Sequence, residues 1–471
     1  MKSGAGVPVK SFVSTRNACK LCSPLGACFA FRGIEGCIPL IHGSQGCATY
    51  IRRYGISHFR EPIDIASSNF TEAAAIFGGK DNLFTALDNV SRAYRPAAIG
   101  ITSTCLSETI GEDVSMYLKQ YETRRGQGLC DNAGHCPAIF YASTPSYRGT
   151  HVEGFHEAIY AAVRALISDG PAADQRRVKV PPRINLISGL LSAEDLRELH
   201  AILKSFAAPY TLLPDYSESL DGPSWAGYQK LPAGGTKADD IRSMKDAAGT
   251  LYLGFSSSPE RDAGQWLASR FGVPLTHMDF PLGIENCDVF FESLSRLCEK
   301  PVPEFWTKQR GRLIDAYIDG HKYCNGKKAI IYGEEDFVVA IASFLDEIGV
   351  VPVAAATGAQ SNSFAHRIRK ALKNTRQQTL IMDKADFAGI LEAVKGGGLE
   401  ADFVMGHSKG LYLARNLGLP LLRCGFPVHD RIGGQRILHL GYKGTLNLFD
   451  LVCNTLMQAR QEKFSSGYTY I

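Results

Sequence analysis

Cysteines are concentrated near the start of this sequence. Six of the 13 cysteines in the 471-residue chain lie before residue 106: Cys19, Cys22, Cys28, Cys37, Cys47 and Cys105. Cys47 directly follows Gly46, and Cys105 comes just after an apolar stretch with the pattern of a buried strand. Small neighbours let the backbone approach a bulky group, and thiolates at such positions are typical ligands of iron–sulfur clusters. We interpret Cys22, Cys47 and Cys105 as the ligands of such a cluster.

Other roles for the cysteines stay open on the sequence alone. Cysteine is also a small buried hydrophobe, and we assign that role to cysteines in apolar or helical settings: Cys37, Cys287, Cys298 and Cys453. Cys19 and Cys22 form a Cys-x-x-Cys pair, which alone is half a zinc site or a redox dithiol. No second Cys-x-x-Cys and no His-x-x-x-His follows it. A zinc-stabilised binding protein is therefore one alternative.

Nucleotide binding and hydrolysis have less support. Neither a Gly-x-Gly-x-x-Gly nor a Walker A sequence is present, so nothing favours a nucleotide site on this chain. Spacing alone does not exclude a Ser-His-Asp or Cys-His hydrolase.

Composition excludes several other classes. Hydrophobic residues make up 45% and charged residues 21%, which is ordinary for a globular protein large enough for several cores. A formal net charge of +4 in so long a chain does not argue for nucleic acid or a membrane surface. The N-terminus lacks the apolar core of a signal peptide, and no apolar run approaches the roughly 20 residues that span a bilayer. We therefore expect a cytoplasmic protein whose thiols stay reduced.

The elements that position the cysteines follow a repeated β-loop-α pattern. We expect strands at residues 38–41, 97–102, 138–141, 184–187, 250–255, 328–332, 350–354 and 402–405. We expect helices from residue 46 and at 71–77, 108–119, 151–167, 192–206, 260–271, 304–323 and 337–348, with a surface loop at 120–140. This alternation predicts an α/β fold of three Rossmann-like, doubly wound domains with parallel sheets. Gly- and Pro-rich segments suggest domains at residues 1–177, 178–303 and 304–471.

A set of motifs spread over nearly the whole chain resembles the β subunit of nitrogenase component 1. The N-terminal motifs are Cys22-Ser-Pro-Leu-Gly-Ala, His42-Gly-Ser-Gln-Gly-Cys47, His58-Phe-Arg-Glu-Pro62, Phe77-Gly-Gly79, Ser103-Thr-Cys105 and Ile110-Gly-Glu-Asp113. The later motifs are Pro281-Leu-Gly-Ile, Gly406-His-Ser-Lys-Gly410, the stretch from Arg423 to Arg431, and Leu440-Gly-Tyr442. The cysteine set with its spacing is the most specific part of the resemblance.

The resemblance implies a cluster site and partners. It implies an α2β2 heterotetramer with an [8Fe-7S] P-cluster shared with the α subunit between domains at the subunit interface, and a second complex iron–sulfur cofactor in the α partner. Cys22, Cys47 and Cys105 match the P-cluster thiolates. Ser146 matches a serine that ligates an oxidised P-cluster, although a strand-end turn is an equal alternative for it. Tyr50 matches an aromatic residue close to the cluster.

The resemblance also implies how electrons enter. An ATP-dependent iron–sulfur reductase protein would dock on this chain, and Phe77 matches an exposed residue of that docking face. Without the resemblance, the sequence favours Phe77 as a residue that caps the core. Substrate reduction would take place in the α partner, so we expect no catalytic residue on this chain.

Some features depart from the molybdenum-type β chain. Its long N-terminal extension is missing, and the short form resembles β chains of vanadium and iron-only nitrogenases and of nitrogenase-like reductases such as methylthio-alkane reductase. Cys19 and Cys28 are additional cysteines with no matching role. We expect the β-like subunit of such an oxidoreductase, in nitrogen fixation or organosulfur reduction. A β chain of a cofactor-assembly scaffold is the main alternative, although such chains usually lack the full cysteine triad.

Overall fold

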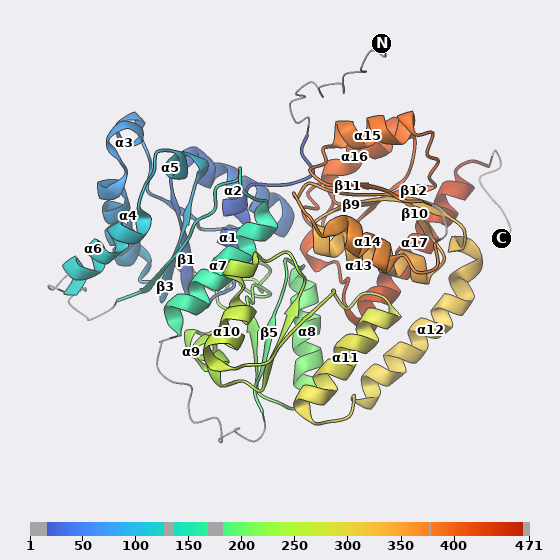
Figure 1. Cartoon of the computed structure of the whole chain (residues 1–471), viewed down its shortest axis with the longest axis horizontal. Helices are drawn as coiled ribbons and strands as arrows, with labels where there is room; N and C mark the ends of the chain where they lie inside the picture. The colour runs from blue at the N-terminus through green and yellow to red at the C-terminus, as the bar shows by residue number, and fades with distance from the viewer. Residues whose placement is uncertain (1–16, 127–135, 168–181, 376–377, 465–471) are drawn as a thin grey trace, which may run out of the picture.

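The computed structural model describes residues 17–126, 136–167, 182–375 and 378–464. The chain forms three α/β units, each built around one sheet whose strands are all parallel (Figure 1). The first unit is blue to cyan in Figure 1, the second green to yellow and the third orange to red. The inner strands of each sheet carry mainly apolar side chains and are buried, as parallel sheets covered by helices on both faces require, whereas the edge strands are only partly buried.

The first sheet has the strand order β2-β1-β3-β4. Its strands are β1 (Cys37–His42), β2 (Ala66–Ser67), β3 (Ala98–Ser103) and β4 (Ala138–Ala142). Its helices are α1 (Ser23–Arg32), α2 (Gln45–Phe59), α3 (Glu72–Phe77), α4 (Lys80–Tyr94), α5 (Cys105–Thr109), α6 (Val114–Gly126) and α7 (His151–Leu166).

Helices α1 and α7 pack with their backbones almost in contact. A Cβ atom on Gly26 of α1 would lie 1.6 Å from the carbonyl oxygen of His151, and one on Gly154 of α7 would lie 2.0 Å from that of Ser23. Only glycine permits this approach. The packing fixes the N-terminus of α1 beside the N-terminus of α7.

The second sheet has the order β6-β5-β7-β8. Its strands are β5 (Ile184–Ile187), β6 (Tyr210–Leu213), β7 (Gly249–Leu253) and β8 (Leu275–Met278). Its helical segments are α8 (Ala193–Ser205), α9 (Ala238–Arg242), η1 (Ser243–Asp246), η2 (Pro259–Arg261), α10 (Ala263–Phe271) and α11 (Ile284–Cys298). Ser192 and Asp195 form the capping box that the sequence predicts at the start of α8.

The third sheet has the order β11-β10-β9-β12-β13, which is the 3-2-1-4-5 order of a Rossmann fold. Its strands are β9 (Lys328–Gly333), β10 (Val351–Thr357), β11 (Leu380–Met382), β12 (Phe403–Gly406) and β13 (Leu421–Arg423). Its helical segments are α12 (Glu304–Cys324), α13 (Glu335–Glu347), α14 (Phe364–Ala371), α15 (Phe387–Gly396), η3 (Ser408–Gly410), α16 (Leu411–Leu417), η4 (Gly434–Arg436) and α17 (Gly441–Gln461).

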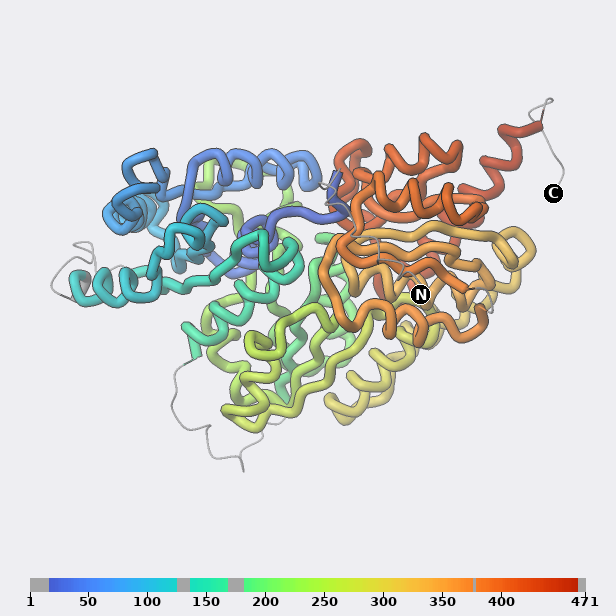
Figure 2. Tube along the Cα trace, turned by 45° about the horizontal axis from the view of Figure 1, so that its top comes forward, coloured from blue at the N-terminus to red at the C-terminus, as the bar shows by residue number. Residues whose placement is uncertain are grey.

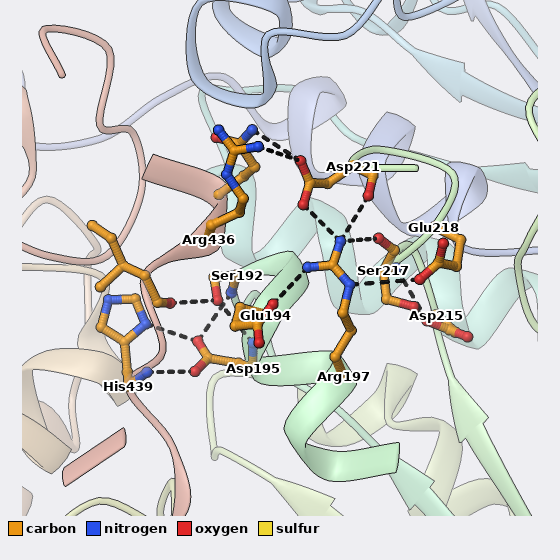
Figure 3. Close-up of polar contacts among 12 residues, drawn as sticks. Ser192, Glu194, Asp195, Arg197, Asp215, Ser217, Glu218, Asp221, Arg436 and His439 are labelled. Carbon is orange, nitrogen blue, oxygen red and sulfur yellow. Dashed lines mark hydrogen bonds and ion pairs between the residues drawn. The ribbon is translucent and has the colours of Figure 1, made fainter. Parts of the chain in front are cut away.

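A polar network ties the C-terminal part of the chain to the second unit (Figure 3). The buried Asp195 carboxylate accepts hydrogen bonds from the backbone N–H of His439 at 2.6 Å and of Leu440 at 3.0 Å. Arg197 lies at the centre of the remaining ion pairs, which involve Glu194, Glu218 and Asp221. These contacts hold the segment between η4 and α17 against α8.

The structure confirms the predicted α/β class with parallel sheets, and each sheet lies inside one predicted domain range, although the domain boundaries themselves stay a prediction. Two local predictions are wrong. The predicted helix 108–119 is broken between α5 and α6, where Gly111 has φ +81°. Residues 120–126 are helical rather than part of a loop, while 127–135 lie outside the described residues. Helices α1 and α17 were not expected.

Candidate cluster site

The three predicted ligands occupy equivalent places, each at the start of a helix. Cys22 is the N-cap residue of α1, Cys47 is the third residue of α2, and Cys105 is the first residue of α5. The last two follow β1 and β3, neighbouring strands whose next connections run to opposite sides of the sheet. In α/β proteins, ligands bind outside the carboxyl ends of strands at this kind of crossover point.

The structure brings the three sulfurs into one electrostatic neighbourhood. Burial raises the pKa of the Cys47 thiol, a hydrogen bond with Ser44 lowers it, and the charges of Cys22 and Cys105 raise it further. Thiols interact in this way only when they lie near one another. A P-cluster or another polynuclear cluster needs such a convergent set of thiolates.

Ser146 lies between two of the cysteines. Its backbone N–H donates to the Cys105 Sγ at 3.3 Å, and its Oγ accepts from the backbone N–H of Ser23 at 3.2 Å. It therefore connects the residue after Cys22 to Cys105. The role of its hydroxyl as a cluster ligand stays a prediction.

Exposure separates these cysteines from the others. Of the free cysteines in the described part of the chain, Cys22 and Cys47 are half-buried and Cys105 is exposed, whereas the remaining eight are buried. The four cysteines assigned to the core are among those eight: Cys37, Cys287, Cys298 and Cys453. The accessible thiols are thus the three that the sequence selected.

The zinc alternative gains no support. Cys19 packs in the core of the third unit with Tyr332, and burial raises the pKa of its thiol well above the ordinary value. Within the described residues, no three His, Cys, Asp or Glu side chains lie close enough together to bind a single metal ion. Three thiols that converge without forming a mononuclear site fit the rim of a larger cluster whose other ligands come from elsewhere.

Tyr50 lies one turn after Cys47 on α2. It is 39% exposed, and its ring packs against Tyr54 with the ring centroids 4.7 Å apart. Burial raises the pKa of Tyr50 well above its ordinary value, and the nearby charge of Cys22 acts in the same direction. The structure thus places Tyr50 beside the cysteines, as expected for an aromatic neighbour of a cluster.

Phe77 lies away from the core at the end of α3. Its side chain is 87% exposed and that of Ile76 is 75% exposed. Gly78 ends the helix with φ +93°, a conformation that suits glycine. The alternative that Phe77 caps the core is therefore wrong, and its docking role stays a prediction.

Residues 406–410 match the Gly-x-Ser-x-Gly pattern of hydrolase nucleophile elbows. The Ser408 side chain is buried, and its Oγ donates to an Asp430 carboxylate oxygen at 2.5 Å. The backbone of Ser408 also lacks the positive φ of a strained elbow. The hydrolase alternative gains no support.

Sequence reasoning missed two residues that support the site, His151 in the first unit and Lys409 in the third. The backbone N–H of Leu21 donates to Nδ1 of His151, and the Lys409 ammonium group donates to the carbonyl oxygens of Ala18 and Lys20. The Gly-His-Ser-Lys-Gly motif contains Lys409, but no spacing signal connects it with Cys22.

Among the helices that the structure describes, none has the length and apolarity to cross a membrane.

Comparisons with known proteins identify the family of this chain. A sequence profile for nitrogenase component 1 type oxidoreductases matches residues 22–457. The chain is 34% identical to the nitrogenase molybdenum-iron protein beta chain of Clostridium pasteurianum, covering 94% of this chain and 93% of that protein. It is 32% identical to the nitrogenase iron-molybdenum cofactor biosynthesis protein NifN of Bradyrhizobium diazoefficiens, covering 95% and 90% of the two chains.

A solved structure supports the same relationship. The structure of nitrogenase Cp1 at pH 6.5 superposes with a TM-score of 0.89 at 32% sequence identity, covering 98% of both chains. The family profile, the relatives and this superposition thus place the three parallel-sheet units in the nitrogenase type of oxidoreductase. The chain belongs to the nitrogenase component 1 family, and its relatives are β-chain-like.

Proposed function

We propose that this chain is the β-type subunit of a nitrogenase-like reductase. It relays electrons one at a time from an ATP-dependent iron–sulfur reductase protein to a complex iron–sulfur cofactor in an α-type partner, in the reducing cytoplasm. The observation that carries the proposal is the convergence of the three accessible cysteines in a member of this family.

Cys22, Cys47 and Cys105 would hold this chain's half of an [8Fe-7S] P-cluster. When bound, that cluster supplies reversible one-electron storage. This chain's own contribution is positional: each thiol lies in the first turn of a helix, where backbone N–H groups and the helix dipole favour a thiolate. Ser146, whose backbone N–H donates to the Cys105 Sγ, would offer a further oxygen, and Tyr50 lies one turn after Cys47 on α2.

The exposed surroundings of the thiols favour a shared cluster. Cys105 is exposed, and apolar side chains stand at the surface around it: Leu106 is 38% and Tyr147 58% exposed. Exposed apolar groups around an incomplete ligand set are typical of an interface. An α-type subunit that covers this face would supply the missing ligands, as in an α2β2 heterotetramer.

Phe77 and Ile76 would form the docking contact for the reductase protein. They project from α3 in the same unit that holds the thiols. Electrons arriving at this surface would enter the chain close to the cluster.

A scaffold for cofactor assembly is the second candidate, because NifN of Bradyrhizobium diazoefficiens is 32% identical to this chain. Anaerobic co-purification with the partner chain, followed by iron and sulfide analysis, separates the two functions. An eight-iron cluster with reductase-driven turnover supports the reductase, for which dinitrogen and methylthio-alkanes are the substrates to assay. A four-iron cluster without turnover would indicate the scaffold, and zinc without iron would contradict both.

A further inference from the structure

A short N-terminal segment joins the third unit to the first candidate ligand. This strap (residues 17–22) begins beside β11 and α15, where the backbone N–H of Cys19 donates to the carbonyl oxygen of Ala385 at 3.1 Å. A Cβ on Gly358 would lie 2.2 Å from the Cys19 carbonyl oxygen, so the strap packs directly on this backbone. Figure 2 shows the dark-blue strap against the orange third unit. Cys22, a thiol of the first unit's site, is therefore carried by a segment whose start is fixed to another unit.

The Lys409 side chain makes two hydrogen bonds from the third unit to the strap. It lies in η3, directly after β12, and its ammonium group donates to the carbonyl oxygens of Ala18 at 2.5 Å and Lys20 at 3.0 Å. Lys20 is two residues from Cys22, and the charges of Lys409 and Cys22 interact. Lys409 thus combines two backbone contacts with a positive charge close to a predicted ligand.

The backbone on both sides of Cys22 is bound by side chains from other elements: the Lys20 carbonyl by Lys409, the Leu21 N–H by His151 Nδ1 at 3.3 Å, and the Ser23 N–H by Ser146 Oγ at 3.2 Å. His151 and Ser146 belong to the first unit. Of these three anchors, Lys409 alone comes from the third unit and bears an aliphatic ammonium group.

We propose that Lys409 is a positioning residue for Cys22 and places a fixed positive charge beside the cluster thiolates. The inference rests on the proposed function, because it takes Cys22 as a cluster ligand. Removing the ammonium group would leave two strap carbonyls without their donor, which loosens the backbone that carries the ligand. It would also remove a positive charge that stabilises the more reduced cluster, so the reduction potential would fall.

Hydrogen–deuterium exchange of the metal-free full-length chain tests the positioning role. Lys409→Met should speed exchange in peptides covering the strap and Ser23 by roughly tenfold, the effect of losing its hydrogen bonds. Lys300→Met is the matched control, because the Lys300 ammonium also donates to two backbone carbonyls, those of Phe206 and Ala207, each at 2.8 Å. The control should leave the strap unchanged. Wild-type exchange of the strap in Lys409→Met would overturn the inference.

A redox titration of the anaerobic complex, followed by electron paramagnetic resonance, tests the charge. Lys409→Met should move the cluster midpoint to a more negative potential, and Lys409→Arg, which keeps the charge and donors, should restore it. An unchanged midpoint in Lys409→Met would overturn this role. An iron-free wild-type complex would contradict the proposed function instead, and the exchange experiment, which needs no iron, would still decide whether Lys409 holds the strap.

Discussion

The first and third units have the same kind of sheet, but their sheet edges differ in chemistry. Each sheet has a crossover point, where the connections that follow two neighbouring strands run to opposite sides of the sheet. These strands are β1 and β3 in the first unit, and β9 and β12 in the third. In the third unit, Glu334 and Tyr332 at this edge are paired within the chain. Glu334 is paired with His151 at 3.1 Å, and the Tyr332 hydroxyl donates to the His407 carbonyl oxygen at 2.5 Å.

The first unit leaves its edge open. Cys22, Cys47 and Cys105 reach solvent, and Cys105 has a backbone N–H as its neighbour rather than a charged partner. A fold that can bury polar groups in one unit leaves thiols accessible in another. The edge proposed to hold the cluster is therefore the one that the chain's own side chains do not complete.

The largest effect is expected from removing the thiols at the open sheet edge of the first unit. Alanine at Cys22, Cys47 or Cys105 should each abolish most of the bound iron and the reductase-driven activity, because a cluster iron loses a thiolate. Iron and sulfide analysis of the anaerobic complex measures this. Cys298→Ala, at a buried core thiol, is the control and should cost about 1 kcal/mol of stability with full iron content. Wild-type iron in all three ligand variants would refute the assignment.

An open edge also predicts dependence on a partner. The chain produced alone should fail to build the complete cluster, because the three thiolates cover only one side of it. Co-expression with the α-type chain should restore iron and sulfide to the level of the complex. A stable single chain with a complete cluster and normal turnover would contradict the shared site.

The sequence predicted much of this difference, and physical reasons explain the rest. Cysteines beside glycine and at strand ends identified the open edge, since both features are local. The α/β pattern gave the three sheets, because buried parallel strands are continuous apolar runs. Helix α1 was missed because all its residues are buried, so it has no polar face to create a helical period. Lys409 was missed because its contact with the strap spans 391 positions.

Removing an ion-pair partner at the sheet edge of the third unit, the closed edge, should lower the stability of the chain without changing its iron content. Asp336 is buried, and its carboxylate lies 2.6 Å from the Arg367 guanidinium. Asp336→Ala leaves a buried cation without this partner and should lower the free energy of unfolding by about 3 kcal/mol. Chemical denaturation of the metal-free chain measures the loss. Asp239→Ala, at an exposed ion pair with Arg242, should change stability by less than about 0.5 kcal/mol.

The docking surface should show a smaller effect, on coupling alone. Phe77→Ala should weaken functional coupling with the reductase protein by about 2 kcal/mol, as expected for an exposed aromatic at an interface centre. Melting temperature and iron content should stay at the wild-type level. Tyr228 has the same exposed fraction, 87%, so Tyr228→Ala is the matched control on the second unit. Turnover at limiting reductase that is equal in both variants would remove Phe77 from the docking surface.

Low pH should lower the stability contributed by the closed edge of the third unit by a modest amount. Burial raises the pKa of the Asp336 carboxyl. The charge of Arg367 and hydrogen bonds from Ser256 and Phe255 lower this pKa by more, so in the folded chain it lies below the ordinary value of 3.8. A carboxyl whose pKa is lower in the folded state stabilises the fold above its unfolded pKa, and this contribution is lost as the pH falls through the folded pKa. The melting temperature of the metal-free chain should therefore decrease when the pH is lowered below about 4. Asp336→Asn, which cannot titrate, should show a shallower decline between about pH 5 and pH 3. An equally steep decline in wild type and variant would show that Asp336 contributes nothing to the acid sensitivity of the closed edge.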